Sequence, residues 1–280
     1  MRRADAEDAW AAGQAAFEAR GERWPASTEP PPLRWRRGVE RLLHVLDSDP
    51  GGAWVACEGR RIRGMAMAIV REGIWGLSLF AVDPGVQGNG VGGALLDRAL
   101  AYGHGTRGQI VMSSQDPRAL RLYSRAGFRL LPALAAFGPV DASRLEPEAP
   151  VRQGMSGDFE MAARVDREIR GAAHGDDLPH LVEAGSLLHV VPERGYVVHA
   201  DGSPRLLAAL DEEAARSLLA VALAHAPEGL EAGVLSLTAD QGWAMEVALD
   251  AGLALETSGP TAVRGEPGPL APYLPSPAFL

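Results

Sequence analysis

A glycine-rich stretch, VDPGVQGNGVGGALL, occupies residues 82–96 and contains five glycines. It follows an apolar run that is typical of a strand and leads into an alanine- and leucine-rich run that is typical of a helix. A strand ending at Val82, a glycine-rich turn and a helix beginning near Gly90 together form an anion site, because the first N–H groups of a helix have no intrahelical acceptor. Two bridged phosphates are the natural ligand, since glycines let them approach the backbone closely. For such a loop taken alone, the alternative is a tight connection that binds nothing.

The elements around this stretch predict a mixed α/β domain. Two amphipathic helices come first, three consecutive strands form a meander that leads into the glycines, and the later strands are joined through helices. The meander is expected to be antiparallel. The predicted helices are 6–19, 35–46, 90–102 and 117–126, and the predicted strands are 53–59, 62–72, 74–82, 109–113 and a short last one at 128–131.

The second half of the chain repeats this order of elements. Residues 132–150 carry four prolines and little periodicity, so we expect two domains, 1–140 and 141–280. ALLDRAL at 94–100 aligns with SLLAVAL at 217–223, and RLYSRAGF at 121–128 aligns with EVALDAGL at 246–253, which favours a duplication. The predicted elements are helices at 157–169, 212–225 and 241–251 and strands at 187–192, 195–200, 205–210 and 233–238.

Composition excludes several classes of partner. A net charge of -9 and a sequence pI near 5.3 argue against nucleic acid or an anionic membrane surface, because both attract clustered Lys and Arg. The single cysteine, Cys57, excludes an internal disulfide and is expected to be a small core residue. No His or Cys spacing resembles a zinc site, and the segment 174–180, with two His and two Asp, predicts a helix break. The charged start of the chain carries no apolar signal region, so we expect a cytoplasmic protein, for which a homodimer is compatible with the sequence.

Two separated motifs resemble the GNAT superfamily of N-acetyltransferases. Residues 87–92, QGNGVG, fit the Gln/Arg-x-x-Gly-x-Gly/Ala signature of that family, and Val82-Asp83-Pro84 before them is also typical of it. Downstream, DPRALRLYSRAGF at 116–128 is similar to a second family helix with its Ala, Tyr and Gly-Phe. The whole chain therefore resembles a tandem GNAT protein. The resemblance implies an α/β (α+β) fold of two GNAT-like domains, each a mixed, mostly antiparallel twisted sheet flanked by helices.

The resemblance also implies acetyl-CoA, or another acyl-CoA, as the donor, with no metal. The pantetheine arm is expected beside the strand residues Leu79, Phe80, Ala81 and Val82. The pyrophosphate is expected over Gln87, Gly88, Asn89, Gly90, Val91, Gly92 and Gly93. Asp116 stands where the family usually has Asn, which weakens one polar contact to the donor.

In the family's mechanism an amine attacks the thioester carbonyl directly. Tyr123 matches the usual acid, because a phenol can protonate the departing thiolate, and the Val82 N–H is a candidate for polarising the carbonyl. A tyrosine that only packs between helix and sheet is the structural alternative. The base is not evident: the candidates are Ser78, Glu72 and the terminal carboxylate of Leu280, whose apolar, proline-rich tail is expected to dock.

The second half departs from the pattern. ALDEEAARSLL at 209–219 replaces the glycine loop with acids that would repel a pyrophosphate, and Ala248 aligns with Tyr123. This half is therefore expected to bind no acyl-CoA and to build the other wall of an acceptor pocket or complete a shared sheet. The leading hypothesis is an acetyl-CoA-dependent N-acetyltransferase acting on a small amine, and the alternative is a catalytically silent acyl-CoA-binding or regulatory module.

Overall fold

The computed structural model describes residues 1–21 and 23–280, which form two compact units. The first unit contains Met1–Arg23, Glu29–Val111 and Leu280, and the second contains Trp24–Thr28 and Met112–Phe279. Both units combine strands with flanking helices, so the predicted mixed α/β fold class is confirmed. The domains predicted at 1–140 and 141–280 are defined by the repeat in the sequence, and this boundary stays a prediction. Among the described residues, every helix is too short or too polar to cross a membrane.

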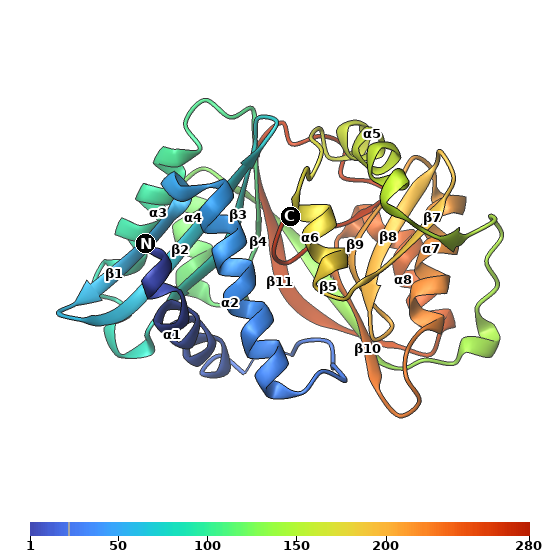
Figure 1. The fold of residues 1–280 in the computed structure, drawn as a ribbon, viewed down its shortest axis with the longest axis horizontal. Helices are drawn as coiled ribbons and strands as arrows, with labels where there is room; N and C mark the ends of the chain where they lie inside the picture. The colour runs from blue at the N-terminus through green and yellow to red at the C-terminus, as the bar shows by residue number, and fades with distance from the viewer. Residues whose placement is uncertain (22) are drawn as a thin grey trace. The chain divides into compact units, whose positions relative to one another are not determined.

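In the first unit four strands follow one another in the order β1-β2-β3-β4 (Figure 1). β1, β2 and β3 pair antiparallel, as predicted, and β4 is parallel to β3. The strands are β1 (Ala53–Glu58), β2 (Arg61–Arg71), β3 (Ile74–Val82) and β4 (Gly108–Met112). The helices are α1 (Ala6–Glu18), α2 (Pro31–Ser48) and α3 (Val91–Tyr102), with short 3-10 turns η1 (Arg3–Asp5), η2 (Pro50–Gly52) and η3 (Pro84–Val86).

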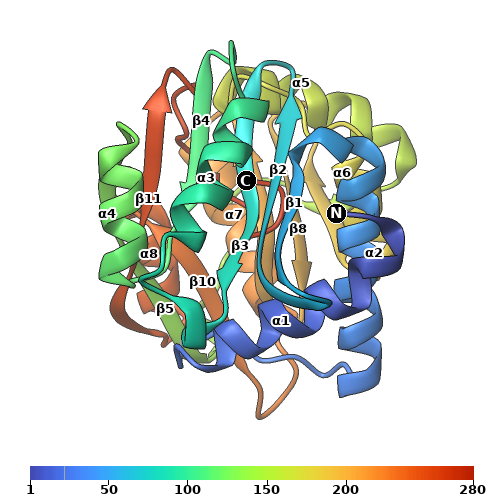
Figure 2. The ribbon, with the colours of Figure 1, turned by 90° about the vertical axis from the view of Figure 1, so that its left-hand side faces the viewer.

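Helices cover both faces of these strands. Gly64 and Met65 are neighbours on β2 and therefore point to opposite faces of the sheet. The Met65 sulfur lies 3.3 Å from where a Cβ on Gly13 of α1 would stand, whereas a Cβ on Gly64 would stand 3.0 Å from Leu95 of α3. In Figure 2 the strands β1–β3 accordingly lie between α2 and α3.

The second unit contains a three-stranded group in the order β11-β5-β10 and a five-stranded sheet in the order β12-β9-β8-β7-β6. The strands are β5 (Arg129–Pro139), β6 (Arg152–Gln153), β7 (Leu187–Val191), β8 (Gly195–Ala200), β9 (Ser203–Ala209), β10 (Glu231–Leu237), β11 (Ala254–Gly265) and β12 (Tyr273–Leu274). The helices are α4 (Pro117–Arg125), α5 (Phe159–Ile169), α6 (Asp177–Glu183), α7 (Glu212–Ala224) and α8 (Gly242–Asp250), with 3-10 turns η4 (Ala142–Arg144), η5 (Ser156–Asp158) and η6 (Ala239–Gln241).

Two apolar clusters lie on opposite faces of β7–β9. Val197 and Leu207 belong to a cluster with α7 and α8, whereas the next residue on β8, Val198, belongs to a cluster with α5. Alternation along the strand explains the division, because successive side chains point to opposite faces. Figure 1 shows α5 and α7 on the two sides of these strands.

The structure differs from some of the predicted elements and from the predicted burial of Cys57. The last strand of the first half is β5, which runs to Pro139, and its partner β11 was not predicted. The pairing between β5 and β11 shifts register between Ser258 and Thr261, and Pro132 of β5 and Pro260 of β11 lie at this irregularity, where a missing N–H does not interrupt the ladder. The helix break predicted at 174–180 is confirmed for residues 174–176, which lie between α5 and α6, but α6 already begins at Asp177, with its proline in the first turn. Cys57 is exposed on β1 and is not a core residue.

Asp49 links three elements of the first unit. This residue is the C-cap of α2, and its carboxylate is buried. It accepts hydrogen bonds from the Val70 N–H at 2.9 Å, the Arg71 guanidinium at 2.6 Å and the Tyr102 hydroxyl at 2.9 Å. Burial, followed by the hydrogen bond to Asp49, raises the pKa of Tyr102 to about 12. One carboxylate therefore joins the end of α2 to β2 and to the end of α3.

We predict that Asp49→Ala lowers the free energy of unfolding by about 3–5 kcal/mol, because it removes the buried carboxylate that the Val70 N–H, the Arg71 guanidinium and the Tyr102 hydroxyl share. Urea titration of both proteins measures the difference. The matched control is Asp47→Ala, two residues earlier, which removes an exposed ion pair with Arg3 and should cost at most about 1 kcal/mol. Equal losses in the two variants would contradict the role given to Asp49.

Candidate functional site

β3 is irregular in the half that leads to the glycine loop. Leu77 pairs with Ala68 and Leu79 with Met67, so Ser78 is an extra residue that forms a β-bulge, and its side chain is buried. On the other edge, the parallel ladder with β4 covers only Ile74–Gly76. The segment that the sequence predicts beside the pantetheine, Leu79 to Val82, thus lies beyond both the bulge and the last pair with β4.

The backbone of Val82 faces the edge of β3 that lies away from β2. The Asp83 N–H donates to the Arg63 carbonyl at 2.8 Å, which makes these residues a hydrogen-bonded pair of the antiparallel ladder. Such pairs alternate with non-hydrogen-bonded ones, so Val82, opposite Gly64, turns its N–H and C=O away from β2. The Gln87 side chain agrees with this orientation, because its Nε2 donates to the Val82 carbonyl at 2.9 Å.

The loop after β3 is shaped by one acid and two glycines. Asp83 accepts from the Arg63 guanidinium at 2.8 Å and from the Gly85 N–H at 2.8 Å, which fixes the start of the loop. Gly88 and Gly90 both have a φ of +84°, a conformation that L side chains rarely adopt. A Cβ at either position would meet no described atom within 4 Å, so the glycines serve the backbone conformation and leave the loop surface open.

The N-terminus of α3 carries no side-chain cap among the described residues. Its N-cap is Gly90, and the first turn contains no acid. The N–H groups of Val91, Gly92 and Gly93 have no intrahelical acceptor, and the helix dipole is positive at this end. An anion at the start of α3 would satisfy both, as the sequence predicts for a phosphate.

The corresponding helix of the second half, α7, begins differently. Its N-cap is Asp211, whose carboxylate accepts from the Ala214 N–H at 2.9 Å and from the Arg194 guanidinium at 2.8 and 2.5 Å. These hydrogen bonds, Arg194 first, hold the pKa of the Asp211 carboxyl below its usual range. Glu213 adds a second carboxylate in the first turn. Negative side chains therefore occupy the end of α7 that corresponds to the open end of α3.

Asp116 and Tyr123 belong to the second unit, on α4. Asp116 is the N-cap of α4 and accepts from the Arg118 N–H at 2.9 Å and from the Arg118 guanidinium, also at 2.9 Å, through both of its oxygens. Tyr123 is buried, and its ring meets Phe128 edge-on at a centroid distance of 6.1 Å. The position of Asp116 thus has a clear capping role, and the predicted donor contact stays a prediction.

The C-terminal tail docks, as predicted. Tyr273–Leu274 forms β12 against β9, and the Ser276 hydroxyl accepts from the N–H groups of Ala278 and Phe279. Phe279 is fully buried with its ring 5.9 Å from that of His180.

The three candidate bases lie at two places in the first unit. Leu280 is fully buried, and its side chain packs on Gly76, where its Cδ1 lies 2.5 Å from the position of a Cβ. Gly76 is two residues from the Ser78 bulge, so Leu280 and Ser78 lie near one point of β3. Glu72 is exposed in the turn before β3, at the opposite end of that strand from the glycine loop, which argues against a role in donor chemistry.

One cluster of histidines was not predicted from the sequence. His189, His199 and His225 gather in the second unit. Their separations of 10 and 26 residues match no metal-site motif, and only the strand pairing and the end of α7 bring them together. The two histidines that the sequence analysis did weigh, His174 and His180, serve the core instead, since His174 Nδ1 lies 2.8 Å from Asp166 and His180 packs on Phe279.

Comparisons with known proteins bear on the first half most directly. Residues 14–128 match the model of the acetyltransferase (GNAT) family. No curated protein matches the chain's sequence significantly. Many solved structures are similar in fold, and three of those that align over most of both chains are described below. A candidate acetyltransferase from Pyrococcus horikoshii is 16% identical and aligns over 100% of this chain and 94% of its own, with a TM-score of 0.78.

The other two similar structures also align over nearly their whole length. A GCN5-related N-acetyltransferase from Sphaerobacter thermophilus is 17% identical over 96% of this chain and 95% of its own, with a TM-score of 0.58. A tandem GNAT protein from the clavulanic acid biosynthesis pathway is 17% identical over 93% of this chain and 95% of its own, with a TM-score of 0.56. At these identities the likeness concerns the fold.

Proposed function

Because residues 14–128 form an acetyltransferase domain of the GNAT family, a family of acyltransferases, we propose that this protein transfers an acetyl group from acetyl-CoA to the amine of a small molecule. The observation that carries the proposal is the end of β3. There, a strand edge that β4 leaves after Gly76 leads into a glycine loop and the uncapped N-terminus of α3. An acyl-CoA combines an amide-bearing arm with a pyrophosphate. The strand edge suits the amides of the arm, and the glycine loop with the N-terminus of α3 suits the pyrophosphate.

Donor binding would use backbone groups for most of its contacts. The first-turn N–H groups of α3 would donate hydrogen bonds to the pyrophosphate between Gln87 and Gly93, and the outer edge of Leu79 to Val82 would pair with the amides of the pantetheine arm. These contacts are made by main-chain atoms. The sequence therefore has to supply only the glycines that allow a left-handed backbone at Gly88 and Gly90.

The transfer forms a C–N bond between the amine and the acetyl carbon and breaks the C–S bond of the thioester. The Val82 N–H would stabilise the negative charge that develops on the carbonyl oxygen. Tyr123 would give its hydroxyl proton to the departing thiolate. For the proton that the amine loses we propose the Leu280 carboxylate rather than Ser78, because a carboxylate is a base at neutral pH and a serine hydroxyl is not.

The second half would serve this reaction without binding a donor itself. The carboxylates of Asp211 and Glu213 at the start of α7 would repel a pyrophosphate, and Ala248 offers no acid in place of Tyr123. The fold similarity to a tandem GNAT protein over 93% of the chain supports a duplication with domains at 1–140 and 141–280. The acidic net charge suits a cationic or neutral acceptor.

The alternative is a module that binds acyl-CoA without turnover. It is favoured by the absence of an acidic side chain on β3 and by Asp116, whose carboxylate is engaged with Arg118. Thiol release from acetyl-CoA over a panel of small amines separates the two functions. Amine-dependent release supports the enzyme, and tight binding without release supports the module.

The proposed donor site predicts one acetyl-CoA per chain by isothermal titration calorimetry, and no binding to the Gly92→Glu variant. The new carboxylate would stand in the first turn of α3, where it is compatible with the helix dipole but repels the pyrophosphate. Ala101→Glu is the matched control, since it makes the same charge change in the last turn of α3 and should keep the affinity. Unchanged binding in Gly92→Glu, or two sites per chain, would contradict the proposed site.

The acid proposed for the reaction predicts that Tyr123→Phe lowers kcat by about 10²- to 10⁴-fold, because it removes only the hydroxyl that would protonate the thiolate. Acetyl-CoA affinity should stay unchanged, and calorimetry on the same variant checks it. An unchanged kcat would assign Tyr123 to packing against Phe128 alone.

For the base, we predict that adding one glycine after Leu280 lowers kcat at least about 10²-fold, because the carboxylate moves by one residue, about 3.5 Å. Leu280→Met is the control, since it keeps both the terminal carboxylate and the volume of the buried side chain. Steady-state rates with a saturating amine measure both. Similar rates for the extended chain and the control would remove the terminus from the mechanism.

A further inference from the structure

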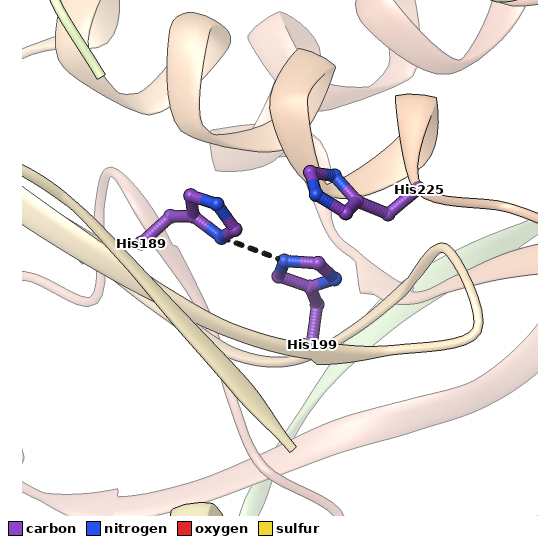
Figure 3. Close-up of side chains that lie close together, drawn as sticks. All are labelled: His189, His199 and His225. Atoms are coloured by element: carbon purple, nitrogen blue, oxygen red, sulfur yellow. Dashed lines mark hydrogen bonds between the residues drawn. The ribbon is translucent and has the colours of Figure 1, made fainter. Parts of the chain in front are cut away.

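Three histidines from three elements of the second unit face one another in Figure 3. His189 lies on β7 and His199 on β8, and the antiparallel register puts them diagonally opposite on one face of the sheet. This is the face that α7 covers, as Val197 and Leu207 in the α7 cluster indicate. His225 is the C-cap of α7 and completes the group from above the strands.

The rings lie close enough to share one ligand. The ring centroids are 5.0 Å apart for His189 and His199, and His225 lies 4.9 Å from each. One nitrogen from each ring can be chosen so that all three lie within 4.8 Å of one another. His189 Nδ1 and His199 Nε2 are 2.9 Å apart and share a hydrogen bond. One shared proton satisfies the hydrogen bond between His189 and His199. The His225 ring takes no part in that hydrogen bond.

The third ring is held in the tautomer that a metal requires. The His225 Nδ1 lies 2.7 Å from the Val221 carbonyl, which can only accept, so Nδ1 carries the proton and Nε2 carries the lone pair. A backbone carbonyl bonded to the second nitrogen is the usual support of a metal-bound histidine.

The environment of the other two rings disfavours their charged form. Burial is the first cause that lowers the pKa of His189, and it lowers the pKa of His199 to about 3, with the neighbouring histidines adding to both effects. His199 is fully buried, and its Nε2 is the nitrogen that faces His189.

We propose that His189, His199 and His225 bind one divalent transition-metal ion of the kind that prefers imidazole, such as Zn²⁺. Three imidazole nitrogens at about 2.0–2.1 Å from a tetrahedral ion lie about 3.3 Å apart, so the His189–His199 pair has to open by only a few tenths of an ångström. His225 is exposed, which gives the ion a route from solvent and leaves a fourth coordination position for water. The negative end of the α7 dipole also favours a cation at this place.

The bound ion would join β7 and β8 to the end of α7. Its effect would be on the stability of the second unit, because ligands that bind only the folded state stabilise it. The site uses none of the residues proposed for donor binding or acyl transfer, so it stands or falls independently of that function.

The test uses the full chain without a histidine tag, freed of metal by a chelator and titrated with Co²⁺ and then Zn²⁺. We expect one Co²⁺ per chain with visible bands of tetrahedral or five-coordinate cobalt, their loss when Zn²⁺ displaces it, and a rise in Tm with Zn²⁺. His225→Asn, an exposed position whose change does not threaten folding, should weaken binding at least about 10-fold and abolish the rise in Tm. His104→Asn, an exposed histidine of the first unit, is the control and should behave as the unchanged chain.

Two results would overturn the proposal. The first is the lack of a saturable Co²⁺ site in the unchanged chain. The second is binding that His225→Asn leaves intact, or that His104→Asn weakens equally, because either outcome places the ion elsewhere. The Tm of each variant without metal should equal that of the unchanged chain, and this measurement separates loss of the site from loss of the fold.

Discussion

The pairing of β3 with its two neighbours is the constraint on which the candidate site depends. On one edge, the antiparallel ladder with β2 fixes the direction of every N–H and C=O and therefore turns those of Val82 outward. On the other edge, β4 matches only Ile74–Gly76. The Ser78 bulge lies between the part of β3 that pairs with β4 and the part that leads to the glycine loop. It adds a residue to β3 and increases the local twist. Backbone N–H and C=O groups need hydrogen-bond partners. A strand that extends beyond its last pair with a neighbouring strand is therefore suited to an amide-bearing ligand.

The two halves of the chain use the same succession of strand, turn and helix with opposite charge at the helix start. At α3 the turn contributes glycine and no acid, which leaves the positive end of the helix to an external anion. At α7 the turn contributes Asp211 and Glu213, and Arg194 holds both of them. At α7 the carboxylate of Asp211 thus occupies the position that an external anion would take at α3. A few substitutions in one turn are enough to give a fold a ligand site or to remove it, which is why fold similarity alone does not transfer function.

Sequence reasoning succeeded where the determining interactions are local. The glycine loop, α3 and the β1–β3 meander follow from turn residues and apolar periodicity, and the structure has them at nearly the predicted bounds. It failed where partners distant in the chain decide. Taken singly, Pro132 and Pro260 each argue against a strand at their position. Both are accommodated because they lie at the same irregularity in the pairing of β5 with β11. The register of β7 with β8 likewise brings His189 to His199, and no spacing in the sequence encodes that contact.

The two proposed ligands follow one electrostatic rule at opposite ends of corresponding helices. A helix offers unpaired N–H groups and positive charge at its N-terminus, and unpaired carbonyls and negative charge at its C-terminus. In α3 the N-terminus has no side-chain cap among the described residues, and the proposed pyrophosphate would bind there. In α7 that end is closed by Asp211, and the C-terminus instead uses the Val221 carbonyl to orient His225 toward a cation. If the halves arose by duplication, the second helix lost an anion site at one end through Asp211 and acquired a proposed cation site at the other, where His225 joins His189 and His199 of two strands.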